Sequence, residues 1–146
     1  MDQVASRATC DRGKTACIAV KNNRILATGY VGSPAGLPHC DEVGHMLRDV
    51  LTPEGKRSKH CVRTIHAEQN VICQAAKFGI SLEGATIYTK MEPCFTCAKM
   101  LTNIGIKRIV CQKRYHAAED TRKLLKQAKV KLEVLSDEVE NYKDQK

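Results

Sequence analysis

The stretch HAEQNVICQAAKF, residues 66–78, predicts an amphipathic helix, because its apolar residues recur at positions 67, 71, 72, 75, 76 and 78. Pro93 begins a second predicted helix, PCFTCAKMLTN, that runs to about residue 103. Short apolar runs at 85–89 and 106–111 follow these two helices and predict buried strands. This alternation of helix and strand is typical of an α/β protein with parallel strands.

Further elements are expected on both sides of this central region. They are an opening helix at 3–11, strands at 14–21 and 24–30 joined by a turn at Asn22-Asn23, a charged helix at 117–128 and a last strand at 130–135. The order β-β-α-β-α-β-α-β predicts a three-layer α/β/α sandwich whose later strands run mostly parallel. We expect one domain over 1–146. Residues 31–64 lack sustained periodicity, so we expect a long loop that is functional or tied down.

Composition favours a globular cytoplasmic protein. Of the 146 residues, 42% are hydrophobic and 27% are charged. No apolar run approaches the roughly 20 residues of a membrane span, and the sequence after Met1 does not resemble a secretory signal. The formal net charge is +8, but only 4% of residues are aromatic, few for a protein that stacks nucleic-acid bases. We therefore expect a solvated basic face, with no nucleic acid and no membrane as partner.

The eight cysteines need a chemical explanation in a reducing compartment, where metal ligation and catalysis are commoner than disulfides. Cys17 and Cys111 lie inside apolar runs and are expected in the core. Cys73, in the middle of the 66–78 helix, is expected to be structural as well.

Two motifs at predicted helix starts carry the chemistry: His66-Ala67-Glu68 and Pro93-Cys94-Phe95-Thr96-Cys97. One imidazole and two thiolates, from His66, Cys94 and Cys97, form the usual ligand set of a zinc ion with one open position. Glu68 lies close enough to face that position without being a ligand, and can move protons as a general acid and base. The pattern H-x-E…P-C-x-x-C is the known signature of zinc deaminases. The alternatives are a capping or core histidine and a structural zinc knuckle, neither of which requires Glu68.

With these motifs the chain resembles the cytidine and deoxycytidylate deaminase superfamily, and within it the deoxycytidylate (dCMP) deaminases. The segments that carry the resemblance are 7–10, 24–30, 32–36, 39–40, 61–70 and 83–88. The resemblance implies a five-stranded mixed sheet flanked by helices, commonly a homohexamer. It implies hydrolysis of dCMP to dUMP and ammonia, with dCTP as a second candidate substrate. It also implies substrate contacts at Tyr115, Ala67, Gly29 and Gly32, although the two glycines are equally explained by a tight turn.

Two features depart from the dCMP branch. Met91-Glu92-Pro93-Cys94 is similar to the tRNA adenosine deaminases and the riboflavin-pathway deaminase, which are kept as an alternative. The family pattern Gly-Tyr-Asn-Gly is replaced by Gly29-Tyr30-Val31-Gly32, and valine cannot make the hydrogen bonds of asparagine. Family members are typically activated by dCTP and inhibited by dTTP with Mg²⁺, so Val31 predicts an altered response to these effectors.

Among the cysteines and histidines outside the catalytic and core sets, the candidate ligands of a second metal are Cys10, Cys40, His45, His60 and Cys61. A second, structural zinc is expected to pin the 31–64 loop, and Cys10 and Cys40 match the thiolate positions of such a zinc in some dCMP deaminases. His45 is the third expected ligand, and His60, or Cys61 in its place, completes the set.

Lys113 and Arg114, beside Tyr115, could bind a phosphate, although a surface role is favoured. A function of a different class is kept as an alternative to deamination. It is that of a noncatalytic zinc module that binds nucleic acid through the basic C-terminal third. That function predicts salt-dependent binding of polynucleotide and no need for Glu68.

Overall fold

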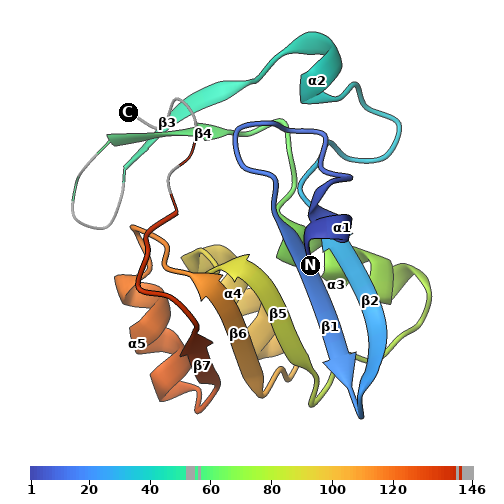
Figure 1. The fold of residues 1–146 in the computed structure, drawn as a ribbon, viewed down its shortest axis with the longest axis vertical. Helices are drawn as coiled ribbons and strands as arrows, with labels where there is room; N and C mark the ends of the chain where they lie inside the picture. Colours follow the sequence, from blue (N-terminus) through green and yellow to red (C-terminus); the bar gives the residue numbers. More distant parts are fainter. Residues whose placement is uncertain (52–54, 56, 141, 143–146) are drawn as a thin grey trace.

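The computed structural model describes residues 1–51, 55, 57–140 and 142, and Figure 1 shows their arrangement. The helices are α1 (Asp2–Ala5), α2 (Cys40–Val43), α3 (Ala67–Lys77), α4 (Phe95–Asn103) and α5 (Glu119–Gln127). The strands are β1 (Ala16–Lys21), β2 (Arg24–Tyr30), β3 (Leu47–Leu51), β4 (Arg57–Cys61), β5 (Thr86–Met91), β6 (Arg108–Lys113) and β7 (Lys131–Val134).

The central sheet has five strands in the order β2-β1-β5-β6-β7. β1 runs antiparallel to both β2 and β5, whereas β5, β6 and β7 are parallel, which confirms the expected mixed sheet. The hairpin between β1 and β2 turns at Asn22 and Asn23, whose φ angles of 51° and 59° suit a tight two-residue turn. The carboxyl ends of β5, β6 and β7 point toward the β3–β4 hairpin, so the loops after these strands gather beneath it (Figure 1).

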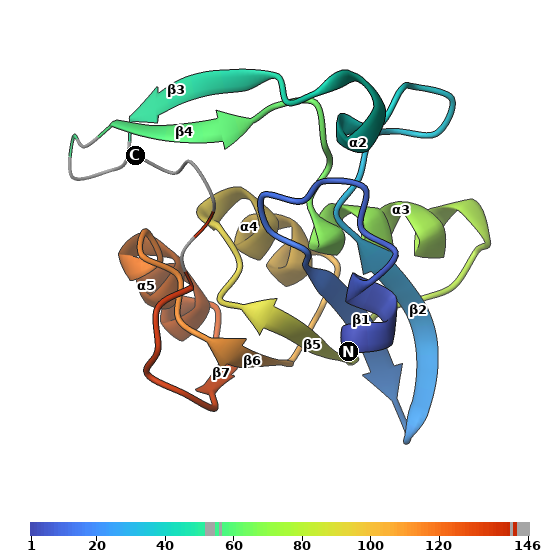
Figure 2. The same cartoon turned by 45° about the horizontal axis from the view of Figure 1, so that its top comes forward.

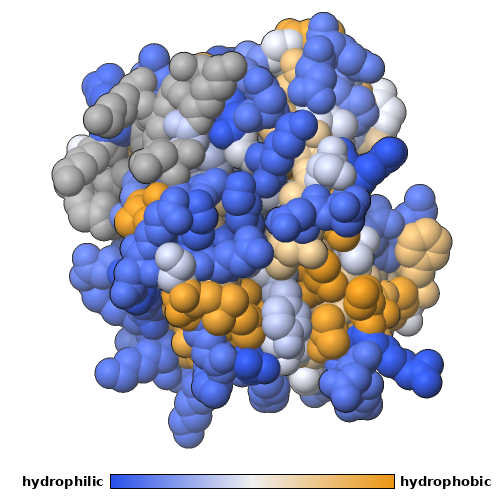
Figure 3. Space-filling view, in the orientation of Figure 1, coloured by the Kyte–Doolittle hydropathy of each residue, from blue (hydrophilic) through white to orange (hydrophobic). Residues whose placement is uncertain are grey.

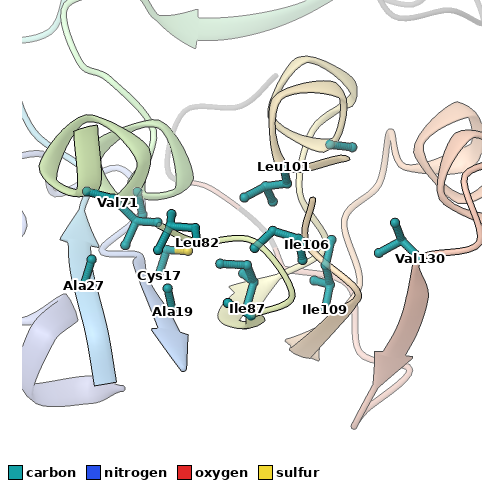
Figure 4. Packing of buried hydrophobic residues seen from close by; sticks show 14 of the residues in the cluster. Cys17, Ala19, Ala27, Val71, Leu82, Ile87, Leu101, Ile106, Ile109 and Val130 are labelled. Carbon is teal, nitrogen blue, oxygen red and sulfur yellow. The ribbon is translucent and has the colours of Figure 1, made fainter. Parts of the chain in front are cut away.

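Alternation along the strands separates the two faces of the sheet. One face carries Cys17, Ile87 and Ile109, all fully buried, against the helices (Figure 4). From α3 and α4, Val71 and Leu101 complete this core, and both are 0% exposed. The helices α3, α4 and α5 form the layer on this side, which matches the expected sandwich.

The opposite face of the sheet is covered only in part, by the short helix α1 packed on β1 and β2 (Figure 1). A shallow apolar groove lies on this face, and its lining includes Met1, Ile18, Val20, Ile25, Tyr88, Val110 and Leu135. Ile25 and Leu135 are 64% and 71% exposed. Apolar side chains therefore gather on the front of the molecule, as the orange surface in Figure 3 shows.

The structure corrects the expectation of a loop at 31–64. This stretch contains α2 and the antiparallel β3–β4 hairpin, which lies over the carboxyl end of the parallel strands (Figure 2). The pattern was hidden because β3 is exposed at four of its five residues. β3 therefore has no buried face that would impose an alternation of apolar and polar residues.

Two smaller expectations are also corrected. The opening helix covers only Asp2–Ala5 instead of 3–11. Cys73 is exposed, because α3 turns its buried face through Val71 and Ala75, which leaves Cys73 on the far side. Cys17 and Cys111 are fully buried as expected. Within the described part of the chain, no helix is long and apolar enough to cross a membrane.

Candidate active site

Two helix starts position the expected ligands. His66 is the N-cap of α3, with its backbone N–H donating to the Gln69 side chain at 2.9 Å. Cys94 is the N-cap of α4, and Cys97 lies in the first turn of the same helix. The backbone at a helix N-terminus carries partial positive charge, which stabilises thiolates placed there.

The three ligand atoms have the spacing of a zinc site. The Nδ1 atom of His66 lies 3.5 Å from Sγ of Cys94 and 3.4 Å from Sγ of Cys97. Zinc bonds of about 2.3 Å to sulfur and about 2.0–2.1 Å to nitrogen place N and S ligands about 3.5 Å apart on a tetrahedron. The donor set and its geometry therefore fit the expected metal.

The protonation of His66, Cys94 and Cys97 follows from the close contact of their side chains. Hydrogen bonding from Cys97 and His66 lowers the pKa of the Cys94 thiol to about 4. The resulting thiolate raises the pKa of His66 to about 9. The hydrogen bond to Cys94, together with burial, raises the pKa of Cys97. Metal loading must therefore displace protons from both His66 and Cys97.

Glu68 lies in the first turn of α3, and its side chain is almost completely buried while still lining the cavity. Burial raises the pKa of its carboxyl, and the nearby His66 opposes that shift. A carboxyl with a raised pKa can both accept and return a proton near neutral pH, as a general acid and base must.

These residues open into a cavity of about 110 Å³ whose lining includes His66, Glu68, Cys94 and Tyr115. The expected contact residue Tyr115 is thus placed at the site, and burial raises the pKa of its hydroxyl to about 12, with the charges of Cys94 and Cys97 adding to the effect.

Ala67, Gly29 and Gly32 lie outside the described lining of the cavity. A Cβ on Gly29 would lie 2.4 Å from the Ala67 carbonyl oxygen and 2.5 Å from the Val71 nitrogen. The glycine therefore allows β2 and α3 to approach closely, and its φ is not positive. Gly29 thus has a packing role in place of the tight turn expected for it, and its contact with substrate stays a prediction.

A second group of metal-ligating atoms links Cys10, Cys40, His45 and Cys61, all lying within 4.8 Å of one another. The two sulfurs of Cys40 and Cys61 are 3.6 Å apart, and Sγ of Cys10 lies 3.7 Å from Nδ1 of His45. Tetrahedral zinc places two sulfurs about 3.8 Å apart, so the geometry fits. Nε2 of His45 lies 2.9 Å from the carboxylate of Asp11. A carboxylate in this position orients many metal-binding histidines.

His60, the expected fourth ligand of this group, is replaced in it by Cys61. The two residues are neighbours on β4, and side chains alternate along a strand, so only one can face the group. Both His60 and Cys61 line the cavity that His66 also lines, but only Cys61 belongs to the group of ligand atoms. The geometry therefore favours Cys61, which was kept as the alternative to His60 for the fourth ligand.

Several cavity residues were not identified from the sequence. Arg12, which is buried and donates to the Lys59 carbonyl at 2.9 Å, lines the cavity with Glu92 and Tyr142. Arg12 and Tyr142 lie far from the motifs in the chain and carry no local signal. Glu92 is adjacent to the Pro93-Cys94 motif, and its position there was the available signal.

The basic residues next to Tyr115 are engaged in ion pairs. Lys113 forms ion pairs with Glu138 and Glu140, at 2.8 and 3.1 Å. Arg114 pairs with Asp137 at 2.8 Å. Both cations are thus used to hold the segment that follows β7.

Residues 1–113 match the family described as the cytidine and deoxycytidylate deaminase zinc-binding region. The chain is 38% identical to ComE operon protein 2 of Bacillus subtilis, over 89% of this chain and 64% of that protein. It is 34% identical to the deoxycytidylate deaminase of Schizosaccharomyces pombe, over 88% of this chain and 39% of that protein. The chain thus spans less than two thirds of either relative.

A solved structure, the dCMP deaminase of cyanophage S-TIM5 in complex with dCMP and dUMP, superimposes with a TM-score of 0.72 at 28% identity. The superposition covers 91% of this chain and 89% of the phage chain. The sandwich fold expected from the sequence is confirmed by this similarity.

Proposed function

This chain belongs to the cytidine and deoxycytidylate deaminase family, and on that basis we propose that it hydrolyses the 4-amino group of dCMP to give dUMP and ammonia. The observation that carries the proposal is the buried Glu68 carboxyl in a cavity shared with His66 and Cys94. Similarity to a phage dCMP deaminase that binds dCMP and dUMP favours a nucleotide substrate. We retain dCTP as a second candidate substrate.

The mechanism assigns proton movements to Glu68. Zinc held by His66, Cys94 and Cys97 would supply a Lewis acid that makes an attacking water available at neutral pH. Glu68 takes a proton from that water as its oxygen adds to C4, and delivers the proton to the ring nitrogen. The same carboxylate then takes the proton of the new C4 hydroxyl and gives it to the amine, so that the C4–N bond breaks, a C4 carbonyl forms and ammonia leaves. Tyr115 forms part of the wall against which the pyrimidine is held.

Glu68→Gln tests this assignment, because an amide fills the same space but cannot shuttle protons. We expect kcat to fall by about 10²–10⁴-fold while zinc content is retained. Metal analysis and the spectral change from cytosine to uracil are measured on the same preparation. If Glu68→Gln keeps activity near that of the wild type, Glu68 has no part in the mechanism. If the variant loses zinc, Glu68 is a metal ligand.

A substrate series separates deamination of a free nucleotide from binding of nucleic acid. Purified protein is tested on dCMP, dCTP, deoxycytidine, cytidine and single-stranded DNA. The proposal expects turnover of a free nucleotide and no salt-dependent polynucleotide binding. The nucleic-acid module is not favoured, since the basic residues Lys113, Arg114 and Arg122 are already held in ion pairs.

The proposal includes a second zinc at Cys10, Cys40, His45 and Cys61. It would tie the segment after α1 to α2 and the β3–β4 hairpin, and offset part of the entropy lost by ordering that region. The wild type should contain two zinc ions per chain, and Cys61→Ser should contain one. His60→Ala is the matched control and should keep two. One zinc in the wild type, or loss of zinc in His60→Ala with Cys61→Ser unaffected, contradicts this assignment.

A homo-oligomer, with six subunits as the expected number, is also part of the proposal. It is supported by the incompletely covered apolar face around Ile25 and Leu135, which a second copy could bury. Light scattering measures the assembly, and Leu135→Glu should shift it toward smaller species. A wild-type monomer would contradict the oligomer.

Effector regulation by dCTP and dTTP, with Mg²⁺, is proposed in an altered form. Val31 is buried against Ala8, Cys10 and Cys40, so its side chain offers no hydrogen bond where the family has asparagine. Saturation curves for dCMP, with and without each effector, are compared for the wild type and Val31→Asn. Strong dCTP activation of the wild type would contradict the role of Val31.

The proposal also includes a cytoplasmic location, because thiol ligands stay reduced in that compartment.

A further inference from the structure

Glu92 is a carboxylate buried within the fold. Its side chain is 0% exposed, and it follows the last residue of β5, just before Pro93 and the expected ligand Cys94. A carboxylate is costly to remove from water unless its oxygens accept strong hydrogen bonds, and apolar residues of similar volume are often at least as stabilising. Its presence is therefore better explained by what it holds in place than by stability alone.

Among the described residues, the partners that the structure gives the Glu92 side chain come from the segment that follows β6. Arg122 of α5 donates two parallel hydrogen bonds to the carboxylate, from Nε and Nη2, both of 2.7 Å. The backbone N–H of Tyr115 donates a third, at 3.0 Å. Nη1 of Arg114 lies 3.5 Å away. A bidentate guanidinium fixes both the distance and the plane of the carboxylate.

These bonds link two walls of the catalytic cavity. Glu92 is attached through the chain to Cys94, and its hydrogen bond to the Tyr115 amide fixes the backbone from which the tyrosine ring extends. That ring packs with Met91 and Ala118 in a cluster that Cys94 also contacts. Displacement of the Tyr115 backbone would therefore change the width of the cavity at the zinc ligands.

We infer that Glu92 is a positioning residue, which holds Tyr115 against the substrate through the Tyr115 amide and the Arg122 guanidinium. The effect of Glu92 on substrate binding rests on the proposed deamination. The effect of Glu92 on the position of Tyr115 does not depend on that proposal. Glu92 itself transfers no proton and touches no reacting atom.

The test is Glu92→Gln, which keeps the shape but places an amide NH₂ against a guanidinium, so the bidentate pair is lost. We expect KM for dCMP to rise on the order of tenfold, with a smaller change in kcat and unchanged zinc content. The increase should disappear in a Tyr115→Ala background. Equal increases in both backgrounds would show a general structural role and overturn the inference.

Glu133→Gln is the matched control, because Arg108 donates to Glu133 in the same bidentate manner, at 3.0 and 2.8 Å, outside the cavity. It should leave KM unchanged. If Glu92→Gln does not fold, Arg122→Lys keeps the charge but only one donor group, and its increase in KM should depend on Tyr115 in the same way. An increase that does not depend on Tyr115 overturns the inference.

A substrate-free measurement separates this inference from the proposed function. Ring NMR signals of ¹³C-labelled tyrosine should shift for Tyr115 in Glu92→Gln, while those of Tyr30 and Tyr88 remain. An unchanged Tyr115 signal overturns the inference whatever the substrate. A shifted signal in a protein that deaminates no nucleotide supports the positioning role and refutes the proposed function.

Discussion

Gly29→Ala should destabilise the protein through backbone contact rather than through loss of a substrate contact. The new Cβ would lie 2.4 Å from the Ala67 carbonyl oxygen and 2.5 Å from the Val71 nitrogen, where ordinary contacts are 3.4–4 Å. Both atoms belong to the backbone of α3 and cannot rotate away. The helix must therefore retreat from β2 by about 1 Å, since a close-packed interface has no free space to absorb a methyl group.

The magnitude follows from the cost of overpacking. Inserting a methyl group into a well-packed core costs about 1–3 kcal/mol, and a contact with backbone belongs in the upper half of that range. Reduced freedom of the unfolded chain returns about 0.4–1 kcal/mol, which leaves a net loss of roughly 2 kcal/mol. For a chain of this length that corresponds to a Tm lower by about 4–8 °C.

The same displacement should reach the active site, because His66 and Glu68 lie at the start of α3. A shift of about 1 Å in catalytic groups can lower kcat by about 100-fold. Thermal unfolding, zinc content and kinetics are measured on zinc-loaded protein.

Gly32→Ala is the control. Its nearest obstacle is the Thr9 hydroxyl at 2.8 Å, which belongs to a side chain that can rotate. We expect a loss of no more than about 1 kcal/mol, from the hydrogen bond between Thr9 and His39. If Gly29→Ala keeps its Tm and kcat but raises KM, the packing explanation is refuted and a ligand role is favoured.

Three further predictions concern the core, the thiols and the hairpin. Leu101→Ala should lower the free energy of unfolding by about 2.7–5 kcal/mol, because Leu101 is 0% exposed among the core residues; a loss below 1 kcal/mol in denaturant unfolding would show that the site collapses around the cavity. In zinc-loaded protein, Cys73 should react rapidly with iodoacetamide while Cys17 stays protected until unfolding, so Cys73→Ser should remove the fast phase. Removal of zinc by a chelator should lower the protection of backbone amides from hydrogen exchange in β3 and β4 before it affects the central sheet, because the hairpin makes few buried contacts. Unchanged protection would show that the hairpin does not depend on metal.

Much of the fold, and the grouping of His66, Cys94 and Cys97 in the candidate site, could be predicted from the sequence, because the signals are local. Apolar spacing in 66–78 and 93–103 sets two amphipathic helices, and the ligands His66 and Cys94 occupy their N-caps as the motifs indicated. The turn at Asn22 and Asn23 depends on two residues that tolerate positive φ. In these cases the residues that determine the structure are adjacent in the chain.

Other features depended on the tertiary structure, because they arise from contacts between distant segments. Whether His60 or Cys61 faces the second ligand group depends on the phase of β4, and the hairpin showed no apolar alternation to reveal it. The packing role of Gly29 depends on how closely α3 approaches β2, and the link from Glu92 to Arg122 spans 30 residues. The distance between two such segments is set only when the elements pack together. Local backbone preference does not determine it, because close packing of whole surfaces decides how near two elements can approach.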